Sequence, residues 1–412
     1  MTIRTLATRR TLGLAGLAVV ARVGYWLATL DYSPVSDAYS YHLIARSIRD
    51  GVGFSDVFPE LSLHTTAFRA PLFPSLLALP YRVFGAHVGV GRLTTLVLGV
   101  VLVLLVERFA SRIGGATAGL VAAIAVAVYP PLVANDVAIL GETLSLILIV
   151  VVGMLLLDDR WQWAAVATGF LVLARNSAQL YALVVAAVLL GRIGWKRTLV
   201  FLGIVFLVVS PWLIRNAIQI GAPVPTTSNG FNLAALYSVE AHHDDDFVDP
   251  VFDKRFADLR LVQFDELDWD EELRSRGLEG LRAHPLEPLR VARRNLVRHF
   301  ELKPWENDDA EEMDGRSLTV RHVTLPLFYL VTIAGIAGLW LWRRHRGIGF
   351  LALTAAYFSL VSIFSVFAPR LRGPFDLVCC IGVGLLVAHV RGPTGAAPPA
   401  SSTRARPGAR TP

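Results

Sequence analysis

Ionisable residues interrupt or flank several long apolar runs of this 412-residue chain. A charged side chain in or near hydrocarbon is costly, and membrane proteins usually retain one there for a function. When the chain is divided at its apolar runs, these residues all fall at the outer ends of the expected spans. We therefore expect them to converge on one extracytoplasmic site. They are Asp37, Arg69, Asp136, Glu142, Arg175, Arg215, Arg370 and Arg372.

The first candidate acid, Asp37, comes directly after the first apolar run. It precedes a short helical pattern that includes Tyr41 and ends at Gly51 and Gly53. A helix of this kind on the membrane surface would hold Asp37 at the boundary between water and lipid. A partly desolvated carboxylate there could accept a proton from a substrate hydroxyl. The alternative is that Asp37 only caps the helix.

The second outer loop adds Asp136 and Glu142, and Glu142 stands at the head of an apolar span. A carboxylate in that position needs a partner, which could be a substrate group, a metal or an arginine. Capping of the span by Glu142 together with Thr143 is the alternative. Both acids remain candidates for the same site.

Five arginines on the outer side supply the opposite charge. Guanidinium groups bind phosphate oxygens through two parallel hydrogen bonds, so arginines on different helices could hold a phosphate group. Snorkelling of the side chain toward the headgroups explains any single one of them. It explains less well why five gather outside, against the usual inward bias of arginine. They are Arg69, Arg175, Arg215, Arg370 and Arg372.

A divalent cation is possible at the site, but no cofactor is certain. His242 and His243 precede three consecutive acids, Asp244 to Asp246, which could bind such a cation. A solvated loop is the favoured interpretation of that segment. No group of residues in the sequence demands a metal.

Membrane helices must position these side chains. The chain is 54% hydrophobic and 17% charged, which indicates a polytopic membrane protein. With the N-terminus in the cytoplasm, the arginine-rich connectors all become cytoplasmic, as the positive-inside rule requires. The formal charge of +6 therefore gives no sign of nucleic-acid binding. The expected spans are about ten helices, at 11–30, 87–107, 115–133, 142–157, 161–175, 177–191, 198–216, 323–342, 348–367 and 375–391.

The spans divide the chain into four parts. Residues 1–216 form an N-terminal transmembrane module that includes the first outer loop, 31–86. Residues 217–322 form an extracytoplasmic segment, and 323–391 form the C-terminal transmembrane helices. The tail, 392–412, reads as disordered and cytoplasmic. Both termini are thus expected in the cytoplasm of a multi-pass protein of the cell membrane.

Two further helices are expected on the outer side. The run 70–85 is apolar but short and rich in proline, so we interpret it as an interfacial or re-entrant helix. Apolar residues at helical spacing predict an amphipathic helix over 286–301. Its arginine stripe, Arg290, Arg294 and Arg298, is interpreted as a face in contact with solvent or headgroups rather than a phosphate site.

Five segments in this order resemble the GT-C superfamily of membrane glycosyltransferases. The resemblance is to glycosyltransferase family 39, with its dolichyl-phosphate-mannose-protein mannosyltransferase-like and aminoarabinose-transferase-like members. It covers about residues 10–390 and implies an all-α polytopic fold with outer juxtamembrane helices and a modest extracytoplasmic helical segment. The segments are SDAYSYHLIARSIRDGVGF, FRAPLFPSLLALPYRVFG, LGETLSLIL, SPWLIRNAIQIGAPVPTTSNGFNL and APRLRGPFDL.

The resemblance implies inverting transfer of a sugar from a polyprenyl-phosphate donor to a cell-envelope acceptor on the extracytoplasmic side. The acceptor could be a glycan, a lipid or a protein. Asp37 matches the first-loop general base of the family, and Glu142 matches a recurrent acid of the second loop. Arginines that would hold the donor phosphate are Arg69, Arg215, Arg370 and Arg372. Candidate substrate contacts are Tyr41, Asp136, Arg175 and Asn216.

Two other classes of function are compatible with a polytopic chain. A transporter or lipid flippase also places charges in membrane helices, but usually near the midplane and often within repeated halves. A non-catalytic membrane assembly protein would not need five outward arginines. Because the charges here are expected at one face, the glycosyltransferase hypothesis is preferred.

Overall fold

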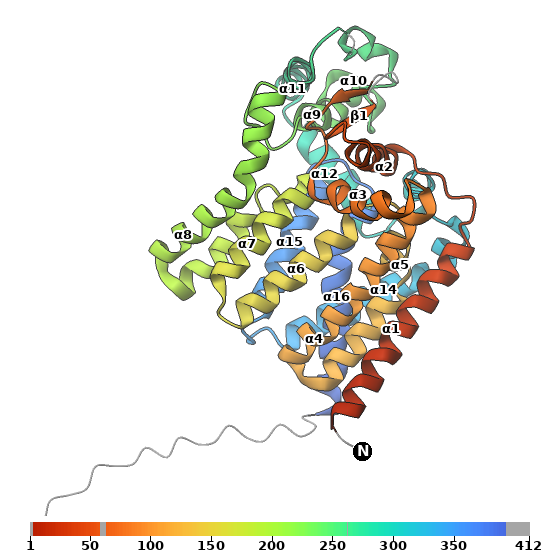
Figure 1. The fold of residues 1–412 in the computed structure, drawn as a ribbon, viewed down its shortest axis with the longest axis vertical. Helices are drawn as coiled ribbons and strands as arrows, with labels where there is room; N and C mark the ends of the chain where they lie inside the picture. Colours follow the sequence, from red (N-terminus) through yellow and green to blue (C-terminus); the bar gives the residue numbers. More distant parts are fainter. Residues whose placement is uncertain (1–2, 58–62, 262, 393–412) are drawn as a thin grey trace, which may run out of the picture.

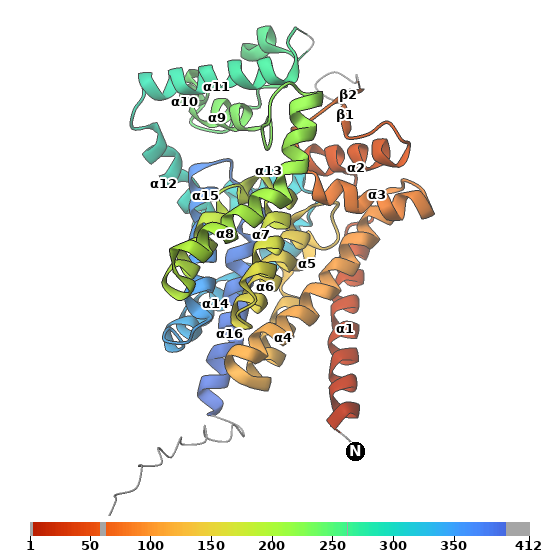
Figure 2. The ribbon, with the colours of Figure 1, turned by 60° about the vertical axis from the view of Figure 1, so that its left-hand side comes forward.

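The computed structural model describes residues 3–57, 63–261 and 263–392, with side chains described from residue 9 onward. The tail predicted to be disordered, apart from Gly392, lies outside the described residues. The described part of the chain is predominantly helical (Figure 1). An elongated body of long helices has a second, more irregular group of helices at one end (Figure 2).

Apolar helices form the body. Four stretches of the described chain are long and apolar enough to cross a membrane, namely Val88–Val128, Asn176–Gln219, Leu318–Leu341 and Pro369–Arg391. The helices of the body are α1 (Ile3–Leu27), α4 (Val88–Val128), α5 (Pro130–Asn135), α6 (Glu142–Leu157), α7 (Trp161–Ala174), α8 (Tyr181–Gln219), α14 (Leu318–Leu341), α15 (Ile348–Phe364) and α16 (Gly373–Arg391).

Two of these helices are each divided at a glycine. Gly115 in α4 and Gly194 in α8 have φ values of 79° and 77°, which glycine adopts without steric cost. Each of the ten predicted spans overlaps one of the body helices or one of these four halves. The membrane class is therefore supported, while the crossing of a bilayer by all ten segments stays a prediction.

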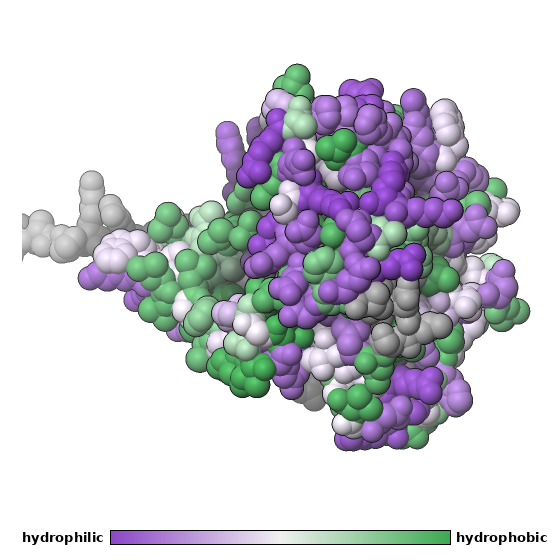
Figure 3. Space-filling model, turned by 90° about the horizontal axis from the view of Figure 1, so that it is seen from above, coloured by the Kyte–Doolittle hydropathy of each residue, from purple (hydrophilic) through white to green (hydrophobic). Residues whose placement is uncertain are grey.

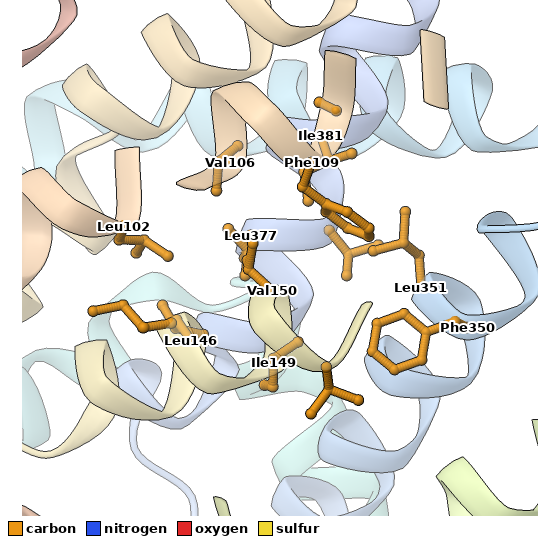
Figure 4. Packing of buried hydrophobic residues seen from close by; sticks show 14 of the residues in the cluster. Leu102, Val106, Phe109, Leu146, Ile149, Val150, Phe350, Leu351, Leu377 and Ile381 are labelled. Carbon is orange, nitrogen blue, oxygen red and sulfur yellow. The ribbon is translucent and has the colours of Figure 1, made fainter. Parts of the chain in front are cut away.

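Buried aliphatic and aromatic residues pack the body together, as Figure 4 shows for side chains from α4, α6, α15 and α16. Phe109 of α4, for example, lies in one cluster with Val150 of α6 and Leu377 of α16. The backbones of α14 and α16 approach very closely, because a Cβ atom at Gly338 would lie 1.9 Å from the carbonyl oxygen of Gly382. Small residues allow this contact between membrane helices.

The end group contains the segments expected outside. Viewed from this end, the surface is largely hydrophilic (Figure 3). A two-stranded antiparallel hairpin, β1 (Ser55–Val57) and β2 (Leu63–Thr65), was not expected from the sequence. The helices are α2 (Ser36–Arg49), α3 (Leu72–Phe84), α9 (Asn229–Tyr237), α10 (Val239–Asp244), α11 (Glu266–Ala283), α12 (Glu287–His299) and α13 (Asp308–Met313), with 3-10 turns at Asn176–Ala178, Lys254–Leu259, Pro304–Asn307 and Pro369–Arg372.

The predicted amphipathic helix forms as α12, but its faces are used differently from the prediction. Leu286, Leu289 and Leu296 remain exposed, whereas polar residues of the helix, such as Asn295, are buried. An apolar face open to the outside is consistent with contact with lipid.

The arginine stripe of α12 is covered by the acidic run at 244–246. Arg290 lies 2.8 Å from Asp245, and Arg298 lies 3.1 Å from Asp246. Both the stripe and the acidic run are thus internally paired. We therefore assign neither of them to a cation or a phosphate.

Candidate active site

Asp37 lies in the first turn of α2 and faces two arginines. Its Oδ1 is 2.6 Å from Nη2 of Arg69, and its Oδ2 accepts a 2.5 Å hydrogen bond from Nη2 of Arg370. Arg69 comes from the loop before α3, and Arg370 from the turn before α16. Burial raises the pKa of Asp37, but the two guanidinium groups outweigh it and hold the pKa well below its usual value. Asp37 is thus an anion in the resting protein.

The guanidinium of Arg370 is the centre of a larger charged cluster. In addition to its bond to Asp37, its Nη1 lies 3.5 Å from Glu142 and its Nε lies 3.2 Å from Asp314. Arg175, at the end of α7, lies 3.5 Å from the same oxygen of Glu142. The site cluster, as we call it below, comprises Asp37, Arg69, Glu142, Arg175, Asp314 and Arg370.

Asp314 is the member that the sequence analysis missed. It follows α13 at the end of the acidic run 307–314, and none of the acids in that run was among the candidate residues. In the structure its side chain is only 9% exposed. Burial raises its pKa to about 6, although Arg370 and Arg316 act in the opposite direction. Nothing in the sequence distinguishes it from the neighbouring acids, because its burial comes from tertiary packing.

The raised pKa of Asp314 predicts a measurable pH dependence of stability. Between the ordinary aspartate pKa and about 6, the folded protein binds more protons than the unfolded chain, so the free energy of unfolding falls as the pH rises. We expect the free energy of unfolding of wild type to fall by roughly 1–3 kcal/mol relative to that of Asp314→Asn between pH 4 and pH 7. Thermal unfolding in detergent at both pH values would measure this difference, and equal differences at both would contradict it.

Tyr41 lies beside the cluster on α2. The guanidinium of Arg69 stands 5.9 Å from the Tyr41 ring and 4.8 Å from the Phe68 ring. The Tyr41 ring meets Phe73 of α3 edge to face at 5.1 Å. Burial and the nearby Asp37 raise the pKa of Tyr41 to about 12. These contacts fix the orientation of Arg69 toward Asp37.

Asp136 is not in the site cluster. Its carboxylate accepts hydrogen bonds from the guanidinium of Arg22 in α1 and from the Thr143 hydroxyl, the latter at 2.5 Å. Asp136 and Arg22 are both almost fully buried. Arg22 also donates to the carbonyl of Ala127 at 3.1 Å. Arg22 was not among the candidate residues, and together with Asp136 it connects α1 to the end of α4.

Arg215 and Asn216 also lie apart from the cluster. Arg215 donates to the carbonyl oxygens of Thr66 and Phe54 at 2.7 and 2.9 Å, on the two sides of the hairpin. Its guanidinium lies 4.8 Å from the centre of the Trp212 ring. Asn216 is buried and donates to the carbonyl of Val224 at 2.7 Å. These two residues hold loops together, and we do not retain them in the proposed site.

Arg372 belongs to a second buried network, although it stands only two residues from Arg370. It lies 3.0 Å from Glu301 and 3.2 Å from Asp376, and it donates to the carbonyl of His299 at 2.9 Å. A small pocket opens beside this network. Its lining includes Tyr25, Pro130, Arg316, Arg321, Phe328 and Arg372. The candidate base Asp37 forms its ion pairs with Arg69 and Arg370 rather than with the arginines of this pocket, so we place the phosphate beside the site cluster.

Solved structures of another protein share the fold of this chain. No family model and no curated protein matches the chain. The solved oligosaccharyltransferase of Archaeoglobus fulgidus matches in its apo form with a TM-score of 0.54 and 15% identity, over 93% of this chain and 50% of that one. Its complex with an inhibitory peptide and a dolichol-phosphate matches with a TM-score of 0.51 and 14% identity, over 92% of this chain and 50% of that one.

A further structure of that oligosaccharyltransferase, in complex with Zn and sulfate, gives a TM-score of 0.51 and 15% identity, over 92% of this chain and 49% of that one. The chain thus spans about half the length of these solved proteins. The likeness shows that the chain shares the fold of these solved proteins over about half of their length, and the GT-C superfamily stays a prediction. Glycosyltransferase family 39 stays a prediction as well.

Proposed function

We propose that this chain is an inverting membrane glycosyltransferase. It transfers a sugar from a polyprenyl-phosphate donor to a cell-envelope acceptor on the extracytoplasmic side, with Asp37 as general base. The observation that carries the proposal is the meeting of Asp37 with Arg69 and Arg370, which come from segments far apart in the chain. The solved neighbour that holds a dolichol-phosphate supports a lipid-linked donor.

The two arginines are shared between the base and the donor. In the resting protein they hold the Asp37 carboxylate and keep its proton affinity low. A donor phosphate offers the same guanidinium groups stronger, bidentate partners. Once the phosphate takes over these bonds, the proton affinity of Asp37 rises toward that of an ordinary or desolvated carboxylate. Donor binding thereby converts Asp37 into an effective base.

The transfer step then balances without a redox partner. The acceptor hydroxyl oxygen forms a bond to the anomeric carbon while its proton passes to Asp37. The bond from that carbon to the phosphate oxygen breaks on the opposite face, and the electron pair leaves with the polyprenyl phosphate. Arg69 and Arg370 stabilise the charge that develops on the leaving phosphate. Inversion at the anomeric carbon follows from the direct displacement.

Glu142 and Arg175 position this machinery. Glu142 lies between the guanidinium groups of Arg175 and Arg370, 3.5 Å from each. It is the first residue of α6 and is buried, so the helix end fixes its carboxylate. The favourable interaction of an acid with a helix N-terminus contributes to this. Through Glu142, the arginine that contacts Asp37 is held at a defined position.

The solved neighbour in complex with Zn and sulfate makes a divalent cation possible for proteins of this fold. In the site cluster, however, Asp37, Glu142 and Asp314 are already directed at the guanidinium of Arg370. Within the described residues, no three His, Cys, Asp or Glu side chains form a group suited to a metal. The residues present do not fit a resident metal ion, and we derive no step through one.

The proposed orientation, with ten spans and both termini in the cytoplasm, can be tested by cysteine labelling. The native cysteines, Cys379 and Cys380, are buried, so their background is expected to be low. We expect Glu272→Cys, exposed on α11 near Asp270, to react with an impermeant maleimide added outside intact cells. Lys196→Cys, exposed two residues after the break in α8 at Gly194, should react only after the cells are opened. Labelling in the reverse pattern would show that the predicted orientation in the membrane is wrong.

The function itself is tested with purified protein in membranes and a panel of labelled polyprenyl-phosphate sugars. We expect release of labelled sugar to an acceptor fraction from at least one donor, with inverted configuration in the product. Failure with every donor, for protein shown to be folded, would contradict the proposal. Movement of the lipid across the bilayer without sugar transfer would instead indicate a flippase.

A further inference from the structure

Three carboxylates from three separate elements surround the guanidinium of Arg370. Asp37 comes from the start of α2, Glu142 from the start of α6, and Asp314 from the segment between α13 and α14. They lie 2.5, 3.5 and 3.2 Å from Nη2, Nη1 and Nε of Arg370, so each guanidinium nitrogen faces a different acid. Carboxylates are the ligands that a hard divalent cation takes, but these three stand apart around the guanidinium, and within the described residues they do not form a group suited to a metal.

The contacts are electrostatic rather than a set of ideal hydrogen bonds. Among the described residues, Nε and Nη1 of Arg370 have no hydrogen-bond partner of good geometry, and neither has Oδ2 of Asp314. Yet the side chains of Arg370, Glu142 and Asp314 are all at most 9% exposed. Charges removed from water at this depth are tolerated only when opposite charges compensate them. The guanidinium of Arg370 therefore compensates the charge of these buried carboxylates, as a bound cation would.

The charge balance is already complete. The three carboxylates are matched by the guanidinium groups of Arg69, Arg175 and Arg370. A divalent ion added among them would give the buried cluster two excess positive charges, unless a guanidinium moved out. Such an excess is costly in a site of low dielectric constant. Arg372, by contrast, lies between two acids, Glu301 and Asp376, within hydrogen-bond distance of both.

We propose that the guanidinium of Arg370 is the resident cation of this site and takes the place that a divalent metal would otherwise occupy among Asp37, Glu142 and Asp314. The inference deepens the proposed function, on which its consequence for catalysis depends. A covalently attached cation cannot be removed by a chelator. It also presents paired N–H groups to the leaving phosphate, which a bare ion does not.

Binding of Mn²⁺ to purified protein in detergent, followed by electron paramagnetic resonance, tests the assignment independently of activity. We expect wild type to show no saturable site with a Kd below about 100 µM. Arg370→Ala leaves three converging acids without their central cation and should gain one such site. Adding Glu142→Gln to Arg370→Ala should weaken that site at least about tenfold, since one ligand is lost. The matched control Arg372→Ala, which frees two acids, should gain none.

A saturable Mn²⁺ site in wild type that Asp37→Asn abolishes would overturn the proposal. A folded Arg370→Ala protein that gains no site would overturn it as well. If Arg370→Ala does not fold, Mn²⁺ titrations of wild type and of Asp37→Asn still test the proposal. The proposal requires that wild type has no saturable Mn²⁺ site that depends on Asp37. In an active preparation, EDTA should leave the transfer rate within about twofold. Absence of transfer under all conditions would count against the proposed function, whereas the Mn²⁺ result would still decide the role of Arg370.

Discussion

Asp37→Asn is expected to lower sugar transfer by about 10²- to 10⁴-fold, the range typical for loss of a general base. The amide has nearly the same shape as the carboxylate but cannot take the acceptor proton. It also releases Arg69 and Arg370 from the carboxylate that holds them in the resting protein. Donor binding should therefore be retained or strengthened while the maximal rate collapses, so kcat falls without a rise in KM.

Initial rates with labelled donor, divided by the amount of folded protein, would measure this effect. Asp50→Asn is the matched control, because Asp50 follows the same helix and also lies beside an arginine, at 2.6 Å from Arg49, but is exposed. It should leave transfer unchanged. Normal transfer by Asp37→Asn would remove the base from the mechanism. A loss of donor affinity equal to the loss of rate would instead indicate that Asp37 only holds the two arginines in place.

Much of the fold could be predicted from the chain because hydropathy and arginine placement report membrane spans directly. The predicted ranges 87–107 and 115–133 overlap the two halves of α4, which Gly115 separates, and the second range runs on into α5. The hairpin at Ser55–Val57 and Leu63–Thr65 was not predicted, because strands of three residues carry too little pattern. The pairing of the arginine stripe of α12 with acids was missed as well, since periodicity along a helix does not report what packs on its polar face.

The site could be predicted only in part, for a geometric reason. Position along a span gives the depth of a side chain but not the direction in which it points. Arg370 and Arg372 stand two apart in a 3-10 turn, where successive side chains are about 120° apart, so they enter different networks. Asp314 was missed because its importance comes from burial, which the acidic run around it does not reveal.

Asp136 looked like a substrate contact in the sequence, but in the structure it forms a buried ion pair with Arg22. We expect Asp136→Ala to destabilise the protein by about 3–5 kcal/mol, because it leaves the guanidinium of Arg22 buried without its partner. Replacing both residues, with Arg22→Met added to Asp136→Ala, should restore most of the loss, since a buried ion pair exchanged for apolar side chains is often neutral or stabilising. Thermal unfolding in detergent would measure both variants.

The exposed pair Arg112–Asp158, with a separation of 2.9 Å and both side chains about 40% exposed, provides the matched control. Asp158→Ala there should cost no more than about 1 kcal/mol, because solvent screens the pair. Transfer per folded molecule should be unchanged in the Asp136→Ala and Arg22→Met double variant. If that variant is stable but inactive, Asp136 acts on the substrate after all. If the double variant is no more stable than Asp136→Ala alone, the buried pair is not what the single substitution disrupts, and the connection between α1 and α4 has another source.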